Sequence, residues 1–308
     1  MIDLFPFSGF TVGVLGLGPH GIMTARSLDL SGAEVWAWDD DPDKRDMAEE
    51  EGVPLVDLGN CDAREIVSLA IETGIPHDGI NDHAVVKAVR DARGEVISAA
   101  ELLARAQRDA VYLGITGTGD TDFLATLTTH VMEVAGKDVE LGGMADKPML
   151  GMHPLGLGGT YIVLMPPEKL DMTVSITFET AIWYGADASL DEAALTAMRN
   201  IFHRQTKPRT AIISIDDPVS RDIFDALSKA DEQVVVGISC REEVPGGIYL
   251  SGSMLVDDIQ GKAVPVTDLG SYDSYIEDEQ KRAAAFTYAA ALSFGIEPRV
   301  AMACLQGF

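Results

Sequence analysis

The chain has 308 residues, of which 46% are hydrophobic and 23% are charged, a balance typical of a globular protein with room for two domains. This composition excludes collagen, a coiled coil and a disordered chain. The 49 acidic and 23 basic residues give a formal charge of -26, which repels nucleic-acid backbones and anionic lipid surfaces. We therefore expect neither a nucleic acid nor a membrane as a partner.

The cysteines, the histidines and the N-terminus indicate the cellular compartment and whether a metal ion is bound. Cys61, Cys240 and Cys304 are far apart and odd in number, so we expect neither a disulfide framework nor a zinc site. The six histidines show no metal-binding spacing. The N-terminus has no basic region followed by an apolar stretch, and no apolar run is as long as a membrane span. The sequence predicts a cytoplasmic protein without a metal ion.

The first hundred residues alternate between strand and helix patterns. We predict strands at 12–17, 33–38, 53–56 and 95–97, and helices from the turn at 18–21 through residue 30 and at 45–51, 63–72, 84–93 and 99–106. This alternation is typical of a small parallel sheet covered by helices. We predict an α/β domain over residues 1–107, with its boundary near Arg108.

The remaining residues repeat the alternation. We predict strands at 110–116, 160–165, 180–184, 210–215 and 233–238, helices at 123–134, 190–203, 219–229 and 278–294, and a late hairpin at 247–250 and 253–256. A second α/β domain over residues 108–308 follows from this pattern. The predicted fold class is α/β, with a parallel sheet in each domain.

The first candidate site is a G-x-G-x-x-G motif between a predicted strand and a helix. It runs Gly16-Leu-Gly18-Pro19-His20-Gly21, and Asp39 ends the next strand 18 residues later. Glycines let a diphosphate approach the backbone, and the strand-end carboxylate can hold a ribose or another sugar. The residues leave open a dinucleotide, a nucleotide sugar and a turn without a ligand. Asp40 and Asp41 disfavour NADP, because its extra phosphate needs a cation.

A second glycine-rich turn, at residues 114–123, stands where a phosphate-binding loop is expected. It contains, in order, Gly117, Thr118, Gly119, Asp120, Thr121 and Asp122. A working loop needs a lysine on the terminal phosphates and a hydroxyl on magnesium, but Thr121 stands at the lysine position. Asp120 and Asp122 add carboxylates that repel phosphate. We expect no ATP site here, and we expect Asp122 to cap the helix at 123–134.

These segments together resemble the Mur ligases, most closely the MurD branch, over almost the whole chain. The matching segments are Gly16–Gly21, residues 35–40, 114–118, 142–143, 214–218 and 283–308. MurD enzymes add D-glutamate to UDP-N-acetylmuramoyl-L-alanine and use ATP to form an acyl phosphate. The resemblance implies a Rossmann-like domain for the UDP-sugar, then a central ATPase-type domain. The family's third domain, which carries the amino acid, is expected to be absent, since the sequence ends at Phe308.

The departures from the family pattern fall on the residues of phosphoryl transfer. In the family's G-T-N-G-K-S/T-T loop the lysine and the following hydroxyl correspond to Thr121 and Asp122. Leu164 stands at the position of a magnesium-binding glutamate, and Met198 at that of a carbamylated lysine. Residues 277–282 replace the family's G-x-H-N-x-x-N. Because these groups act on one transition state, their joint loss predicts a pseudo-ligase without ATP or another cofactor.

The first domain keeps more of the family's binding residues. The resemblance implies a UDP-sugar site at Gly16, Gly18, Pro19, His20, Gly21, Asp39, Asp40 and Gly74. Glu72 and Thr73 replace the family's Ser-Pro, and Glu72 brings a carboxylate near the expected diphosphate. We predict binding of a UDP-N-acetylmuramoyl-type nucleotide, or of a protein partner or second copy on the surface that a third domain would cover.

Two enzyme hypotheses are alternatives to the pseudo-ligase hypothesis. The first is an active ligase that uses ATP and magnesium, of which this chain is a piece. The second is a nicotinamide-dependent oxidoreductase built on Gly16–Gly21 and Asp39, for which the sequence shows neither a recognisable Tyr-x-x-x-Lys nor a convincing acid pair. ATP turnover distinguishes an active ligase from a pseudo-ligase, and NADH binding tests the oxidoreductase hypothesis.

Overall fold

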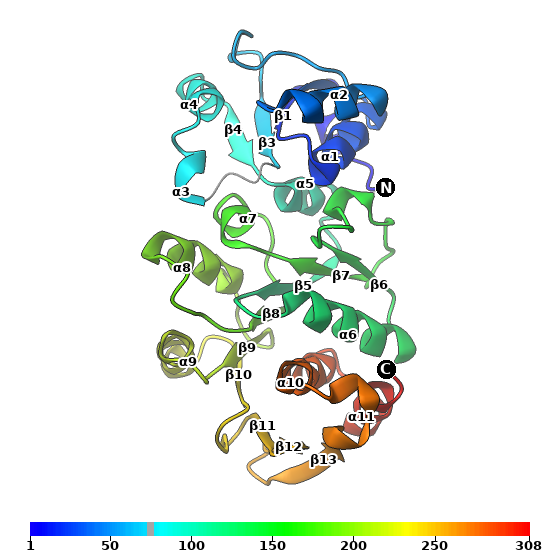
Figure 1. Cartoon of the computed structure of the whole chain (residues 1–308), viewed down its shortest axis with the longest axis vertical. Coiled ribbons are helices and arrows are strands. Elements are labelled where there is room, and N and C mark those ends of the chain that lie inside the picture. The colour runs from blue at the N-terminus through cyan, green and yellow to red at the C-terminus, as the bar shows by residue number, and fades with distance from the viewer. Residues whose placement is uncertain (73–76) are drawn as a thin grey trace.

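The computed structural model describes residues 1–72 and 77–308. Within these residues the strands form two sheets, which Figure 1 shows one above the other. Sheet A has the order β2-β1-β3-β4 and is parallel, and sheet B has the order β13-β12-β11-β10-β9-β8-β5-β7-β6. From β6 to β11 sheet B is parallel, and β12 and β13 continue it antiparallel. The predicted α/β fold class is confirmed.

The elements have the following bounds. The strands are β1 Thr11–Leu15, β2 Glu34–Trp38, β3 Ser68–Ile71, β4 Glu95–Ile97, β5 Val111–Thr116, β6 Val139–Gly142, β7 Thr160–Leu164, β8 Thr180–Trp183, β9 Thr210–Ser214, β10 Val234–Ser239, β11 Ile248–Ser251, β12 Met254–Asp257 and β13 Val264–Asp268. The α-helices are α1 Pro19–Leu30, α2 Pro42–Glu50, α3 His77–Ile80, α4 Ala84–Asp91, α5 Ala99–Ala106, α6 Thr121–Val134, α7 Pro167–Asp171, α8 Glu192–Met198, α9 Pro218–Ala230, α10 Asp278–Ser293 and α11 Pro298–Gln306. Short 3-10 turns lie at Phe5–Phe7, Met149–Gly151, Arg199–Phe202, Leu269–Ser271 and Asp273–Tyr275.

The first βαβ unit forms as the sequence predicts. Strands β1 and β2 pair in parallel from Thr11 with Glu34 to Leu15 with Trp38. Helix α1 begins at Pro19, where a missing N–H is harmless because the first turn has no carbonyl to receive it. The unit therefore places the Gly16–Gly21 turn at the carboxyl edge of sheet A.

Two predictions in the first hundred residues are wrong. The predicted helix at 63–72 is instead a turn followed by β3, a central strand between β1 and β4. All four residues of β3 are buried, so neither a helical nor an alternating apolar period marks it. The predicted strand at 53–56 is reduced to a bridge between Ala37 and Leu55, next to Pro54, which has no N–H to donate.

The second part matches its prediction more closely. The hairpin is confirmed, since β11 and β12 pair antiparallel and Gly252 turns between them with a φ of 64°. The predicted helix at 190–203 is α8 followed by a 3-10 turn. Strands β6 and β13 were not predicted.

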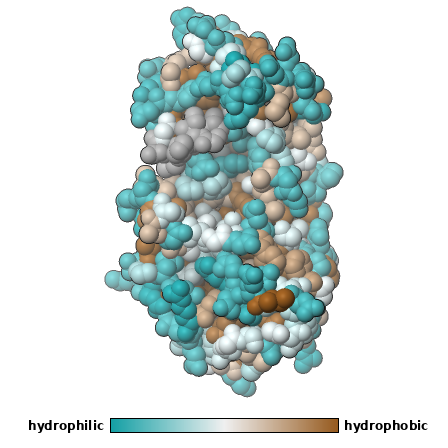
Figure 2. All heavy atoms as spheres, in the orientation of Figure 1, coloured by the Kyte–Doolittle hydropathy of each residue, from teal (hydrophilic) through white to brown (hydrophobic). Residues whose placement is uncertain are grey.

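Sheet B is covered on both faces. Along β7, Tyr161 and Val163 join one core cluster with α8 and α9 residues, and Ile162 and Leu164 join the other with α6, α10 and α11. Such burial on both faces explains the near-continuous apolar strands. Figure 2 shows hydrophilic residues over much of the molecule's surface on the face in view.

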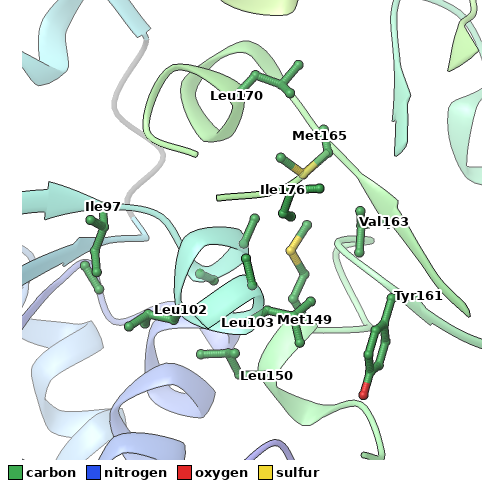
Figure 3. Packing of buried hydrophobic residues seen from close by; sticks show 14 of the residues in the cluster. Ile97, Leu102, Leu103, Met149, Leu150, Tyr161, Val163, Met165, Leu170 and Ile176 are labelled. Atoms are coloured by element: carbon green, nitrogen blue, oxygen red, sulfur yellow. The ribbon is translucent and has the colours of Figure 1, made fainter. Parts of the chain in front are cut away.

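One core cluster connects the two sheets. Figure 3 shows Leu102 and Leu103 of α5 beside Met149 and Leu150 of the segment after β6. The Ile2 N–H donates to the Leu150 carbonyl at 2.9 Å. The contacts hold the carboxyl edge of sheet A near that of sheet B. The domain division at residues 107 and 108 stays a prediction.

A buried carboxylate reinforces this connection. Glu101 on α5 is fully buried, and its Oε2 accepts hydrogen bonds from the Val174 and Ser175 N–H groups at 2.8 and 2.9 Å. Its Oε1 accepts from Ser175 Oγ at 2.6 Å and from Arg105 Nε at 2.8 Å. Burial alone raises the pKa of Glu101, but the hydrogen bonds from Ser175, Arg105 and Val174 outweigh it and lower this pKa.

The described residues contain neither a membrane-spanning helix nor a cluster of metal ligands. No helix among them is both long and apolar enough to cross a membrane. No cluster of three or more His, Cys, Asp or Glu side chains in the described ranges is arranged to hold a metal ion.

Candidate functional site

Two glycine-rich turns lie at the carboxyl edges of the sheets, and each borders a cavity. The cavity at the first turn, here called the glycine-loop cavity, has a volume of about 270 Å³. Its lining comes from both parts of the chain: Gly18, Pro19, His20, Ile71, Glu72, Gly143, Pro166, Glu168 and Lys169. The carboxyl edge of a parallel sheet is the usual place for a ligand in this fold class.

The three glycines of the first turn have different roles. Gly16 has a φ of 100°, which other residues rarely adopt. A Cβ on Gly21 would lie 1.7 Å from the Gly16 carbonyl oxygen, so the turn itself excludes a side chain there. A Cβ on Gly18 would meet no atom within 4 Å. The fold therefore requires Gly16 and Gly21, whereas Gly18 only keeps open the space beside the cavity.

Asp39 and Asp40 lie at the end of β2. Asp39 is buried and accepts hydrogen bonds from the Leu17 N–H at 2.7 Å and the Asp41 N–H at 2.9 Å. Asp39 thus holds the glycine turn in place. Asp40 is exposed, and its carboxylate lies 3.2 Å from His83 Nε2. Their predicted sugar contacts stay predictions, and the predicted site residue Gly74 lies outside the described residues.

His20 reaches from the glycine turn to the second half of the chain. Its Nε2 lies 2.8 Å from the Met144 carbonyl oxygen, so this nitrogen carries the proton and donates it. Burial and the nearby Lys169 lower the pKa of His20, against an opposing effect of Glu72. The imidazole is therefore neutral at pH 7, and it connects the loop after β1 with that after β6.

A buried ion pair lies beside His20. Lys169 Nζ is 3.8 Å from Glu72 Oε2, and the two side chains are 11% and 2% exposed. Thr24 Oγ1 donates to Glu72 Oε1 at 3.2 Å. Sequence reasoning gave Lys169 no role, because its approach to Glu72 depends on a contact between residues almost a hundred positions apart. The pair shows that the Glu72 carboxylate has a cationic partner within the cavity.

The second turn borders a cavity of about 250 Å³, here called the apolar cavity. Its lining is Ile115, Thr116, Gly117, Thr121, Asp122, Gly143, Leu164, Met165, Pro166, Pro167, Leu190 and Met198. The structure therefore brings together Thr121, Asp122, Leu164 and Met198, which lie far apart in the sequence. Leu164 and Met198 are both buried. No lysine or arginine occurs among the described lining residues.

Some N–H groups of the second turn donate hydrogen bonds within the chain. The Asp120 N–H donates to Glu279 Oε1 at 3.1 Å, and the Thr118 N–H donates to the Gly185 carbonyl at 3.0 Å. A Cβ on Gly119 would lie 2.7 Å from Glu279 Oε1. A carboxylate from α10 thus occupies a place where a phosphate loop would present its N–H groups to an anion.

The cap of α6 differs from the prediction. Asp120, not Asp122, caps this helix, because its Oδ1 accepts the Phe123 N–H at 2.9 Å. Helix α6 begins at Thr121, two residues earlier than predicted. Asp122 is an exposed residue of the first turn.

Glu279 belongs to a third cavity, of about 650 Å³, between the second turn and the start of α10. Its ionisable lining residues are Asp187, Asp216, Asp217, Cys240, Arg241, Asp278, Glu279, Lys281 and Arg282. The Arg282 guanidinium lies 4.1 Å from the centre of the Tyr184 ring and bonds to the Tyr184 carbonyl. Burial of the thiol and, to a smaller extent, the negative charge of Asp216 raise the pKa of Cys240 to about 12. This thiol is therefore protonated.

The residues at the apolar cavity do not fit magnesium and a nucleotide triphosphate. Magnesium prefers carboxylate, carbonyl and water oxygens, and the Leu164 and Met198 side chains supply none. A triphosphate needs cations nearby. Among the described lining residues, the only charged side chain is the carboxylate of Asp122, which is an anion.

Solved structures define the class of fold. One is UDP-N-acetylmuramate:L-alanyl-gamma-D-glutamyl-meso-diaminopimelate ligase from Neisseria meningitides, with a TM-score of 0.66 and 16% identity over 97% of this chain and 98% of that one. Another is the UDP-N-acetylmuramate-alanine ligase MurC from Thermotoga maritima, with a TM-score of 0.56 and 12% identity over 97% of this chain and 68% of that one. The chain has the fold of these ligases.

Curated relatives define the family. UDP-N-acetylmuramoylalanine–D-glutamate ligase from Rhodospirillum rubrum is 32% identical over 319 residues, which cover 100% of this chain and 67% of the relative. The enzyme of the same name from Caulobacter vibrioides is 30% identical over 320 residues, covering 100% of this chain and 68% of the relative. No protein-family model matches. The chain belongs to the MurD family of Mur ligases.

Proposed function

We propose that this chain is a MurD-family pseudo-ligase that binds a UDP-N-acetylmuramoyl-type nucleotide and does not catalyse ATP-dependent ligation. The observation that carries this proposal is the apolar cavity, where Leu164 and Met198 lie beside Thr121 and Asp122. We also propose that the chain acts in peptidoglycan-precursor metabolism in the cytoplasm, and its relationship to UDP-N-acetylmuramoylalanine–D-glutamate ligases supports the metabolic assignment. No resident cofactor is expected.

Loss of phosphoryl transfer follows from the chemistry of this cavity. Transfer of a phosphoryl group depends on positioned cations and metal ions that neutralise charge in the transition state. The apolar cavity offers two buried apolar side chains and one carboxylate in those places. The carboxylate of Glu279 also accepts a hydrogen bond from the Asp120 N–H. Together these contacts favour an inactive site over the active-ligase alternative.

Binding of a sugar nucleotide is supported by the glycine-loop cavity. Gly18 leaves the space open for a diphosphate to approach the backbone at the start of α1. Lys169 lies within the cavity, and its pairing with Glu72 limits the repulsion that a free carboxylate there would exert. The nicotinamide-dependent alternative has less support, because no tyrosine of a Tyr-x-x-x-Lys arrangement occurs among the described lining residues of this cavity.

Restoring the missing lysine alone is not expected to restore turnover. In Thr121→Lys, the new ammonium would lie beside Asp122, and Leu164 and Met198 would still provide no metal ligand. We expect ADP release with Mg-ATP, UDP-N-acetylmuramoyl-L-alanine and D-glutamate to stay at background in both the wild type and this variant. ADP release by the wild type that depends on the sugar nucleotide would establish the ligase alternative.

A protein partner is the second way in which the chain can act by binding. In this alternative a protein partner or a second copy of the chain is bound in place of a sugar nucleotide. It predicts complex formation without any sugar nucleotide, which size-exclusion chromatography with light scattering detects.

A further inference from the structure

A single lysine supplies the positive charge of the glycine-loop cavity. The ionised side chains among its described lining residues are Lys169, Glu72 and Glu168, since His20 is neutral. The Lys169 ammonium lies 3.8 Å from Glu72 Oε2, beyond hydrogen-bond distance, and it donates no hydrogen bond to any residue that the structure describes. Lys169 is nevertheless buried. A buried ammonium with unused donors is unfavourable, so this cavity favours an anion that can reach Lys169.

Glu72 is the carboxylate that holds this lysine. It follows β3 and packs against α1, where a Cβ on Gly21 would lie 3.5 Å from the Glu72 Cβ. Thr24 Oγ1 donates to Glu72 Oε1 at 3.2 Å, and the other carboxylate oxygen, Oε2, is the one closer to Lys169. Glu72 therefore lies beside the first turns of α1, where the positive end of the helix favours an anion.

We propose that Glu72 is an internal competitor of the sugar nucleotide, because it holds the lysine that the diphosphate of the ligand needs. This inference rests on the proposed binding of a UDP-N-acetylmuramoyl-type nucleotide. It deepens that function by naming the residue that sets the affinity of the site. Lys169 is the shared cation, attracted to Glu72 in the free protein and to the diphosphate in the complex.

The competition follows from the charges in the cavity. One ammonium cannot pair fully with both Glu72 and a diphosphate, so the ligand gains only part of the attraction of Lys169. When the charge of Glu72 is removed, Lys169 has no anion in the free protein, and the diphosphate gains the whole attraction. Glu168 also repels a diphosphate, but it forms no salt bridge among the described residues. Removal of its charge therefore relieves repulsion alone.

Calorimetric titration of the whole chain with UDP-N-acetylmuramoyl-L-alanine tests the competition. In Glu72→Gln the amide oxygen still accepts the Thr24 hydrogen bond, and we expect binding at least about tenfold tighter than in the wild type. Glu168→Gln is the matched control, because it removes the same charge from the same cavity without releasing Lys169. We expect it to change the affinity by less than about threefold. Equal gains in the two variants overturn the inference, since general repulsion then explains both.

A double variant shows whether the gain depends on the lysine. Glu72→Gln/Lys169→Met keeps the lengths of both side chains and has no ammonium, so we expect it to bind at least about tenfold more weakly than Glu72→Gln. Equal affinities of these two variants overturn the inference. Circular dichroism checks that each variant folds. If Glu72→Gln does not fold, Glu72→Asp takes its place, because its carboxylate is one methylene further from Lys169, and we expect about threefold tighter binding than in the wild type.

The outcomes separate this inference from the proposed function. If the wild type binds the sugar nucleotide and Glu72→Gln binds it no more tightly, the inference is wrong and the proposed function stands. If Glu72→Gln binds and the wild type does not, the inference is supported and the proposed function fails. If neither binds, both are wrong.

Discussion

Gly21→Ala is expected to lower the free energy of unfolding by at least about 3 kcal/mol. A Cβ at this position would lie 1.7 Å from the Gly16 carbonyl oxygen and 2.8 Å from its carbonyl carbon. Both are backbone atoms at the end of β1, so relief requires α1 to move away from the sheet. Urea unfolding followed by circular dichroism measures the loss.

Gly18→Ser is the matched control in the same turn. Gly18 has a φ of -69°, ordinary for any residue, and serine is favoured at this N-cap position. We expect its stability to stay within about 0.5 kcal/mol of the wild type, while its affinity for UDP-N-acetylmuramoyl-L-alanine falls at least about tenfold, because the side chain blocks approach to the backbone. A variant that is stable and binds normally would show that the ligand does not contact this turn.

Glu101→Gln is expected to lower the free energy of unfolding by about 3 kcal/mol at pH 7. The amide keeps the shape of the side chain, but its nitrogen replaces one of the two oxygens and cannot accept the hydrogen bonds made there. These come from the Val174 and Ser175 N–H groups at Oε2, or from Ser175 Oγ and Arg105 at Oε1. The substitution also leaves Arg105 without its buried anionic partner. Glu95→Gln is the control, because Glu95 pairs with the same arginine but is 54% exposed, and we expect a loss below about 0.5 kcal/mol.

The Glu101 contribution depends on pH in a defined direction. Its pKa is lowered in the folded protein, so the unfolded chain binds the proton more readily. The stabilisation is fully present above the unfolded pKa of about 4.3 and is lost as the pH falls through the folded value. The difference in stability between the wild type and Glu101→Gln should therefore narrow in acid. A difference that stays constant down to pH 3 would contradict this role.

The alternation of strands and helices could be predicted because it depends on local pattern. Strands such as β5 and β9 are short apolar runs between glycine or polar turns, which a sequence displays directly. Strand β3 was missed because its four residues follow a polar segment with helix-forming character. Its strand state comes from pairing on both sides with β1 and β4, which are distant in sequence.

The candidate site also has parts that the sequence predicts and parts that depend on contacts between distant residues. The glycine turns could be located from motifs, and the structure brings Thr121, Asp122, Leu164 and Met198 to one cavity. The contact between Asp120 and Glu279 joins residues 159 positions apart, and no spacing rule reveals it. The pairing of Glu72 with Lys169 is equally non-local. Predicted binding residues therefore acquire internal partners that only the fold supplies.

The most direct test of a binding protein without phosphoryl transfer is calorimetric titration of the purified chain with UDP-N-acetylmuramoyl-L-alanine and, in a parallel cell, with Mg-ATP. We predict binding of the sugar nucleotide and no heat of binding from Mg-ATP, because the second turn bonds to Glu279 and the apolar cavity contains no cation among its described lining residues. Tight binding of Mg-ATP would contradict this account.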